Sequence, residues 1–113
     1  MSKLLLALLL AVAPDLSGRW ILSLNPDFSG HDQSLSCTLK QENVTLSADC
    51  LDARFTGRVD GAKVSLQLKT GRNNELSATF EGQANNDGSK IEGMWRLPTP
   101  DGERTGKFTF SKQ

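Results

Sequence analysis

The sequence contains no tyrosine, a single histidine and only two cysteines, and its charges cancel. Thirteen Lys and Arg residues balance thirteen Asp and Glu residues, so the formal net charge is zero. A nucleic-acid-binding domain needs a basic excess to neutralise phosphates, and no nucleic-acid partner is therefore expected. One histidine and two thiols supply too few ligands for a structural zinc site, so we expect no metal and no cofactor.

No group of residues points to catalysis. The only histidine, His31, has no serine and aspartate arranged around it as a hydrolase triad requires. The carboxylates considered for acid–base chemistry fall on polar strand faces or turns, where nothing would remove them from water. We therefore assign no catalytic residue and do not expect an enzyme. These carboxylates are Asp49, Asp52, Glu81 and Glu92.

The N-terminus has the layout of an export signal. A positive charge near the start precedes an unbroken apolar run, Leu4–Val12, and Ala11-Val12-Ala13 has the small–x–small form of a signal-peptidase site. The run is too short to span a bilayer comfortably as a helix. We expect a signal peptide at 1–13, a mature domain at 14–113, and export to the periplasm or the extracellular space. Pro14 would follow the cleavage site, where proline is poorly tolerated, so another site or a retained, membrane-bound segment stays open.

The two cysteines, Cys37 and Cys50, are interpreted in the light of export. An even count in an oxidising compartment suggests a disulfide, and both cysteines fall on the same face of adjacent expected strands. A two-residue turn at Glu42-Asn43 would place Cys37 opposite Ala48. We therefore expect a longer turn or a bulge that brings Cys50 opposite Cys37. Two buried free thiols are the alternative.

From Leu16 onward, apolar residues recur at every second position, which is the period of a half-buried strand. Turn residues such as Asp60-Gly61 separate most segments, and short turns join antiparallel neighbours. Eight such strands can close and lose their edges. We predict an all-β, eight-stranded antiparallel up-and-down barrel with one disulfide and no helical segment; a two-sheet sandwich is the alternative. The segments are 19–24, 34–40, 44–50, 54–59, 63–69, 76–84, 91–97 and 106–111.

A Gly–x–apolar triplet recurs on these strands. Because residues two apart share a face, each of these glycines faces inward beside its apolar partner. An inward glycine leaves room for a tightly coiled strand or for a large side chain lying across it, and Trp20 and Trp95 are the natural candidates. We interpret the repeat as a sign of curvature and closure. The triplets begin at Gly18, Gly57, Gly82, Gly93 and Gly106.

One resemblance covers nearly the whole mature chain. The stretch Asp15-Leu16-Ser17-Gly18-Arg19-Trp20 resembles the Gly-x-Trp opening of lipocalin-like and avidin-like barrels. The later stretches Phe55–Gly61, Phe80-Glu81-Gly82 and Ile91–Trp95 look like small exported bacterial lipocalin-like, calycin-type β-barrel domains. The resemblance implies a lipocalin-like β-barrel over residues 14–113. The polar residues with which avidins hold biotin are missing.

A second resemblance is confined to the first half. Leu16–Ser23, followed by a cysteine pair on the second and third strands, is similar to the periplasmic inhibitors of bacterial metalloproteases. Those proteins are also eight-stranded barrels with one disulfide, and they insert an N-terminal segment into the protease cleft. The resemblance implies that Ala13-Pro14-Asp15 would be the inserting segment here.

Barrels of this kind usually bind their ligand inside. The expected inward face is almost wholly apolar, so two interpretations stay open: a filled core, or a cavity for a small apolar ligand. The long loop Asn25–Gln33 is a lid, a contact surface, or a plug in which Phe28 covers the barrel end. A second loop, Pro98–Glu103, is stiffened by prolines. The candidate ligand-binding residues are Trp20, Phe28, His31, Phe55, Phe80 and Trp95.

These observations favour a non-enzymatic exported β-barrel, expected as a monomer, whose partner is a small apolar ligand. The alternative is a protein-interaction module, such as a periplasmic protease inhibitor, whose partner is another exported protein.

Overall fold

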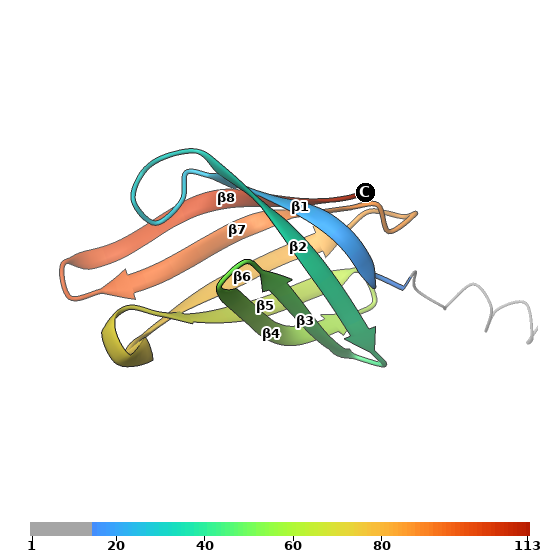
Figure 1. The fold of residues 1–113 in the computed structure, drawn as a ribbon, viewed down its shortest axis with the longest axis horizontal. Coiled ribbons are helices and arrows are strands. Elements are labelled where there is room, and N and C mark those ends of the chain that lie inside the picture. The colour runs from blue at the N-terminus through green and yellow to red at the C-terminus, as the bar shows by residue number, and fades with distance from the viewer. Residues whose placement is uncertain (1–14) are drawn as a thin grey trace, which may run out of the picture.

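The computed structural model describes residues 15–113, and the expected signal peptide lies outside the described residues. The described chain is all-β apart from one short 3₁₀ turn, as the alternating pattern predicted (Figure 1). The strands are β1 (Gly18–Asn25), β2 (Gln33–Glu42), β3 (Thr45–Cys50), β4 (Ala53–Asp60), β5 (Lys63–Thr70), β6 (Leu76–Ala84), β7 (Lys90–Thr99) and β8 (Gly102–Lys112).

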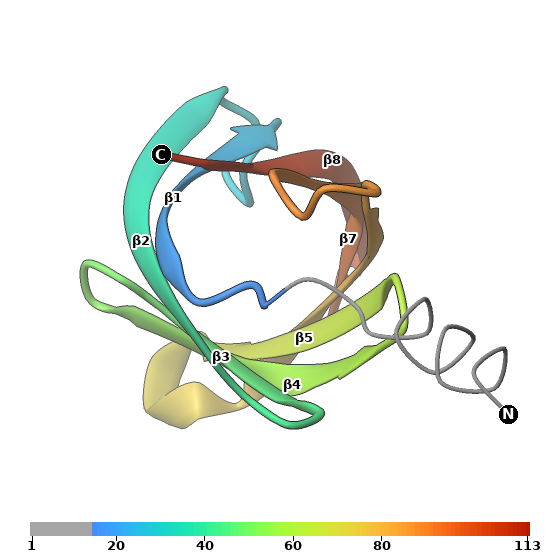
Figure 2. The ribbon, with the colours of Figure 1, turned by 90° about the vertical axis from the view of Figure 1, so that its right-hand side faces the viewer.

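The eight strands form a closed antiparallel up-and-down barrel. Each strand pairs with its sequence neighbour, and β1 also pairs with β8, from Trp20 opposite Lys112 to Asn25 opposite Lys107. Figure 2 looks along the ring of strands from the end that holds the C-terminus. Closure leaves no free sheet edge along the β1–β8 seam, and the two-sheet alternative is wrong. Among residues 15–113, no helix is long and apolar enough to cross a membrane.

Two expectations about connections are corrected. The turn after β5 contains a 3₁₀ helix, η1 (Arg72–Asn74), where no helical segment was predicted; Asn73 within it has φ 59°. The expected loop at Pro98–Glu103 is shorter than its prolines suggested. Pro98 lies in β7 opposite Glu103 of β8, and the strands end at Thr99 and Gly102, so only a two-residue turn joins them.

The barrel interior is packed with apolar side chains. Edge-to-face ring contacts run along the axis, with ring centroids 5.0 Å apart for Phe55 and Phe80 and 6.4 Å apart for Trp20 and Phe110. A void that could hold a water molecule would leave accessible area on the side chains around it. Leu22, Leu46, Leu66, Phe80 and Phe110 have none, so the interior around them is filled.

The inward glycines mark close approaches, as the triplet pattern predicted. A Cβ on Gly93 would overlap the carbonyl oxygen of Glu81 on β6, and a Cβ on Gly57 would overlap the carbonyl oxygen of Ser65 on β5. Gly106 faces Trp95, its partner on β7, whose indole ring occupies the space a Cβ would need. Glycine therefore serves both predicted purposes, since tight coiling occurs at Gly57 and Gly93 and a large side chain lies across Gly106.

The disulfide between Cys37 and Cys50 is present, with a Cα–Cα distance of 4.2 Å. The longer turn or bulge expected between β2 and β3 is wrong. The two-residue turn lies one position later, at Asn43-Val44, because Glu42 pairs with Thr45. That register places Cys37 opposite Cys50. Asn43 has φ 56°, a conformation that asparagine tolerates well. In the chain-entropy model, a cross-link of this spacing contributes about 3 kcal/mol.

Candidate ligand site at the barrel mouth

The loop between β1 and β2 folds over one end of the barrel. We call this end, where the β1–β2 loop and the β3–β4, β5–β6 and β7–β8 turns gather, the barrel mouth (Figure 1). Two long-range hydrogen bonds hold the loop. The indole N–H of Trp95 donates to the carbonyl oxygen of Pro26 at 2.9 Å, and the guanidinium of Arg104 donates to the carbonyl oxygen of Phe28 at 2.7 Å. The loop is therefore tied to β7 and β8.

The loop also holds itself together around Asp27. The carboxylate of Asp27 accepts hydrogen bonds from the backbone amides of Ser29 and His31, at 2.9 Å and 3.0 Å, and from the Ser29 hydroxyl at 2.8 Å. The His31 amide bond is the largest cause that holds the pKa of this carboxyl below its ordinary value of 3.8, followed by the Ser29 hydroxyl. The ionised carboxylate thus fixes the turn that presents Phe28.

Phe28 covers the barrel end as a plug. Its half-buried ring lies 4.9 Å from the Trp95 ring and 6.3 Å from the Phe80 ring, measured between centroids. It therefore extends the aromatic stack of the interior to the mouth. Of the interpretations of this loop left open above, the structure supports the plug.

Beside the plug lies an apolar cleft of about 260 Å³, which we call the mouth cleft. Its wall comes from the β1–β2 loop and from β1, β2, β4, β5 and β6. Most of the lining is apolar, with three polar residues around it, the composition typical of small-molecule sites. The lining residues are Leu24, Asp27, Phe28, Ser29, Gln33, Leu35, Ala53, Phe55, Leu68 and Phe80.

Five of the six candidate ligand residues separate into three groups. Phe28, Phe55 and Phe80 belong to the mouth cleft, where Phe28 is half-buried and the fully buried Phe55 and Phe80 lie beneath it. Trp95 lies on the other side of Phe28 and lines a neighbouring hollow of about 420 Å³. Trp20 is fully buried, and its indole N–H donates to the Leu16 carbonyl oxygen at 2.9 Å. Trp20 is therefore a core residue and does not line the mouth cleft.

His31 is exposed and lines neither hollow. Its ring Nδ1 lies 3.1 Å from the Ser29 hydroxyl, in the outer part of the loop. The backbone of His31, rather than its ring, contributes to the site, because the amide fixes Asp27.

Sequence reasoning missed the part of the site around the β3–β4 turn. A second hollow, of about 350 Å³, has both apolar and charged lining residues; it shares Leu35, Ala53 and Leu68 with the mouth cleft and continues to Leu51. Leu51 is 79% exposed and has φ 56°, a left-handed conformation that costs a non-glycine residue about 1–2 kcal/mol. Leu51 directly follows the inward Cys50, so the alternation places it on the outward face, where an apolar residue departs from the pattern.

A larger groove lies on the outer wall, away from the mouth. It measures about 530 Å³ and crosses β4, β5 and β6, with exposed charged residues of both signs.

The carboxylates Asp49, Asp52, Glu81 and Glu92 are also exposed, as predicted. No group of three His, Cys, Asp or Glu side chains within residues 15–113 is placed to hold a metal ion. Compared with the groove on the outer wall, the mouth cleft has a predominantly apolar lining and lies next to the plug.

Of the segment Ala13-Pro14-Asp15, which the resemblance to protease inhibitors singled out, the structure describes only Asp15. Ala13 and Pro14 lie outside the described residues. The carbonyl oxygen of Asp15 accepts a hydrogen bond from Lys112 Nζ at 3.3 Å, near the start of β1 and therefore at the end opposite the β1–β2 loop. The Asp15 carboxylate accepts a hydrogen bond from the Ser17 amide at 2.9 Å, which is the main cause that lowers its pKa.

No protein-family model and no curated protein matches this chain. The geometry of the barrel mouth is therefore what indicates a function for this chain.

Proposed function

We propose that this chain is a non-enzymatic exported β-barrel that binds a small apolar ligand in the mouth cleft. The observation that carries the proposal is the position of apolar side chains that are incompletely covered. Leu35, Leu68 and Ala53 are half-buried around an apolar hollow, whereas the interior side chains below them are fully buried. A ligand at the mouth would cover this surface without displacing the core.

The polar side chains at the cleft suit a ligand with one polar end. Gln33 and Ser29 offer an amide and a hydroxyl, and Asp27 places a carboxylate there. The Asp27 oxygen that accepts the loop hydrogen bonds is already engaged. We therefore infer an uncharged apolar molecule with at most a hydroxyl, carbonyl or arylamine N–H group at the rim.

The test is binding of N-phenyl-1-naphthylamine, an uncharged apolar fluorophore, to the disulfide-bonded chain. Leu68→Asn places an amide in the cleft wall and should raise the Kd about tenfold or more, because the amide loses water on ligand binding. Ala53→Phe should do the same by filling the cleft.

Met94→Asn is the matched control, since Met94 is 52% exposed on the outer face of β7 and lines neither hollow at the mouth. Its Kd should stay within about twofold of the unsubstituted chain. Failure of the unsubstituted chain to bind the fluorophore, or an equal loss in all three variants, would contradict the proposal.

A second candidate function is interaction with another exported protein. The exposed Leu51 favours it, because a bulky apolar side chain held in a costly conformation on the surface is typical of a contact residue. This candidate uses the β3–β4 turn rather than the Phe28 plug.

A further inference from the structure

The barrel wall has a notch where the β3–β4 hairpin ends before its neighbours. β2 pairs with β1 as far as Gln33, but its pairing with β3 begins only at Thr38 opposite Asp49. Figure 1 shows β2 running on toward the β1–β2 loop beyond the end of this hairpin. The ladder stops because Leu51, the residue after β3, turns away at φ 56°. Within the described chain, Gln33–Ser36 therefore have no strand partner on this side.

The backbone groups that face the notch can be assigned from the disulfide. A Cα–Cα distance of 4.2 Å marks Cys37 and Cys50 as a non-hydrogen-bonded pair, so the amide and carbonyl of Cys37 are directed toward β1. Because direction alternates along a strand, Leu35 is also directed toward β1, and Ser34 and Ser36 are directed toward the notch. Two amides and two carbonyls thus form a short, unpaired strand edge.

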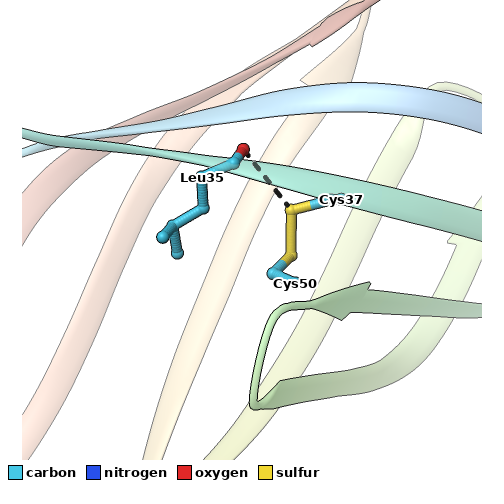
Figure 3. The surroundings of a disulfide bond; sticks show 3 residues. All are labelled: Leu35, Cys37 and Cys50. Carbon is cyan, nitrogen blue, oxygen red and sulfur yellow. Dashed lines mark hydrogen bonds between the residues drawn. A yellow bond between two sulfur atoms is a disulfide. The ribbon is translucent and has the colours of Figure 1, made fainter.

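Figure 3 shows Leu35 and the disulfide on the same side of β2. The sulfur of Cys37 lies 3.9 Å from the Leu35 carbonyl oxygen, but a bridged sulfur has no proton to donate. The disulfide instead fixes the point at which β2 and β3 separate. The edge is therefore held rigidly in place without the partner strand that would normally continue there.

Apolar surface lies directly beside this edge. The hollow of about 350 Å³ is bounded by Leu35 on β2, by Leu51 on the turn and by Leu68 on β5. Asp52, Arg54 and Lys69 also line the hollow. Arg54 pairs with Asp49, and within residues 15–113 Asp52 and Lys69 form no ion pair. The segment Gln33–Ser36 itself contains neither lysine nor proline, the residues that usually block strand addition.

We propose that this notch binds an extended peptide segment of a partner protein, which adds to β2 as a short strand. The peptide backbone pairs with Ser34 and Ser36, an apolar side chain enters the hollow beside Leu35 and Leu68, and Leu51 packs against the peptide. Charges of both signs in the peptide complement Asp52 and Lys69, whereas a uniformly anionic nucleic acid does not. A lipid chain lacks the backbone groups that the edge requires.

This inference deepens the second candidate function. Its hollow shares Leu35, Ala53 and Leu68 with the mouth cleft, so the test uses Ser36 and Leu51, which do not line that cleft. The experiment selects peptides from a phage-displayed library of random heptapeptides on the disulfide-bonded chain. Selected peptides are then synthesised, and their Kd is measured by fluorescence polarisation. We expect enriched sequences that slow hydrogen exchange at the Ser34 and Ser36 amides in the unsubstituted chain.

Ser36→Pro removes the amide that faces the notch and leaves the β1–β2 hydrogen bonds in place. It should raise the peptide Kd at least about tenfold. Ser36→Ala, the matched control, keeps the amide and should stay within about twofold. Urea unfolding measures whether Ser36→Pro is folded, and its affinity for N-phenyl-1-naphthylamine should be kept because Ser36 does not line the mouth cleft.

Leu51→Asn gives a second readout that misfolding cannot imitate. Asparagine tolerates the left-handed conformation better than leucine, so the free energy of unfolding should stay equal or rise while the peptide Kd rises about fivefold or more. Three results would overturn the proposal: no enriched peptide, equal peptide affinity in Ser36→Pro and Ser36→Ala, or a dimer that Ser36→Pro dissociates. The last result would assign the edge to a second copy of this chain.

Discussion

At the scale of single residues, the inward glycines decide where the barrel can curve. Gly57 and Gly93 lie where a neighbouring strand approaches so closely that a methyl group would overlap its backbone. The Gly–x–apolar triplets predicted inward glycines, and the structure confirms them. The sequence could not show that backbone, rather than a tryptophan ring, fills the space at these two positions, because this depends on which strands cross there.

Gly93→Ala should destabilise the fold by about 3 kcal/mol, because the overlapped atom is a backbone carbonyl oxygen that cannot move aside. Urea unfolding of the disulfide-bonded chain measures the change. Gly61→Asn is the matched control: Gly61 has φ 61°, nothing lies near its added Cβ, and asparagine tolerates this conformation. Equal stability of Gly93→Ala and the unsubstituted chain would show that β6 and β7 are farther apart there.

At the scale of elements, the β1–β2 loop is an ordered plug rather than a free connection. Its position depends on one carboxylate, since Asp27 accepts hydrogen bonds from the Ser29 and His31 amides. Its pKa is lowered in the folded chain, so Asp27 contributes to the stability of the loop above its ordinary pKa of 3.8. That contribution is lost as the pH falls through the lower folded-state value.

The amide proton shifts of Ser29 and His31 should therefore titrate together, with a midpoint below 3.8. NMR spectra recorded across acidic pH measure this midpoint. Asp27→Asn should abolish the titration and weaken binding at the mouth cleft, because Phe28 loses its support. A midpoint at or above 3.8 would mean that the carboxylate is not held as described.

The elements also show where sequence reasoning ends. The strands were predictable because each shows apolar alternation, but turns were less so. The β2–β3 turn lies one residue later than expected, which alone places Cys50 opposite Cys37. The β3–β4 turn uses Leu51 at a position where glycine or asparagine is usual, so no turn residue marked it. The notch depends on the positions of both turns and therefore could not be predicted from the sequence.

At the scale of the whole molecule, the barrel divides into a filled interior and a partly uncovered mouth. The sequence predicted an apolar interior but could not distinguish a core from a cavity, because eight strands allow either. Filling depends on how the rings of Phe55, Phe80 and Phe110 meet along the axis. Of the predicted ligand residues, Phe28 is half-buried at the mouth cleft, and the fully buried Phe55 and Phe80 form its floor.

The central claim is that an apolar ligand binds at the mouth and not inside the barrel. Methyl NMR of leucine-labelled protein, titrated with N-phenyl-1-naphthylamine, tests it most directly. We predict shifts for the leucines that line the mouth cleft and unchanged resonances for leucines that are fully buried in the interior. Shifts confined to the interior set would contradict the account. The first set is Leu24, Leu35 and Leu68, and the second is Leu22, Leu46 and Leu66.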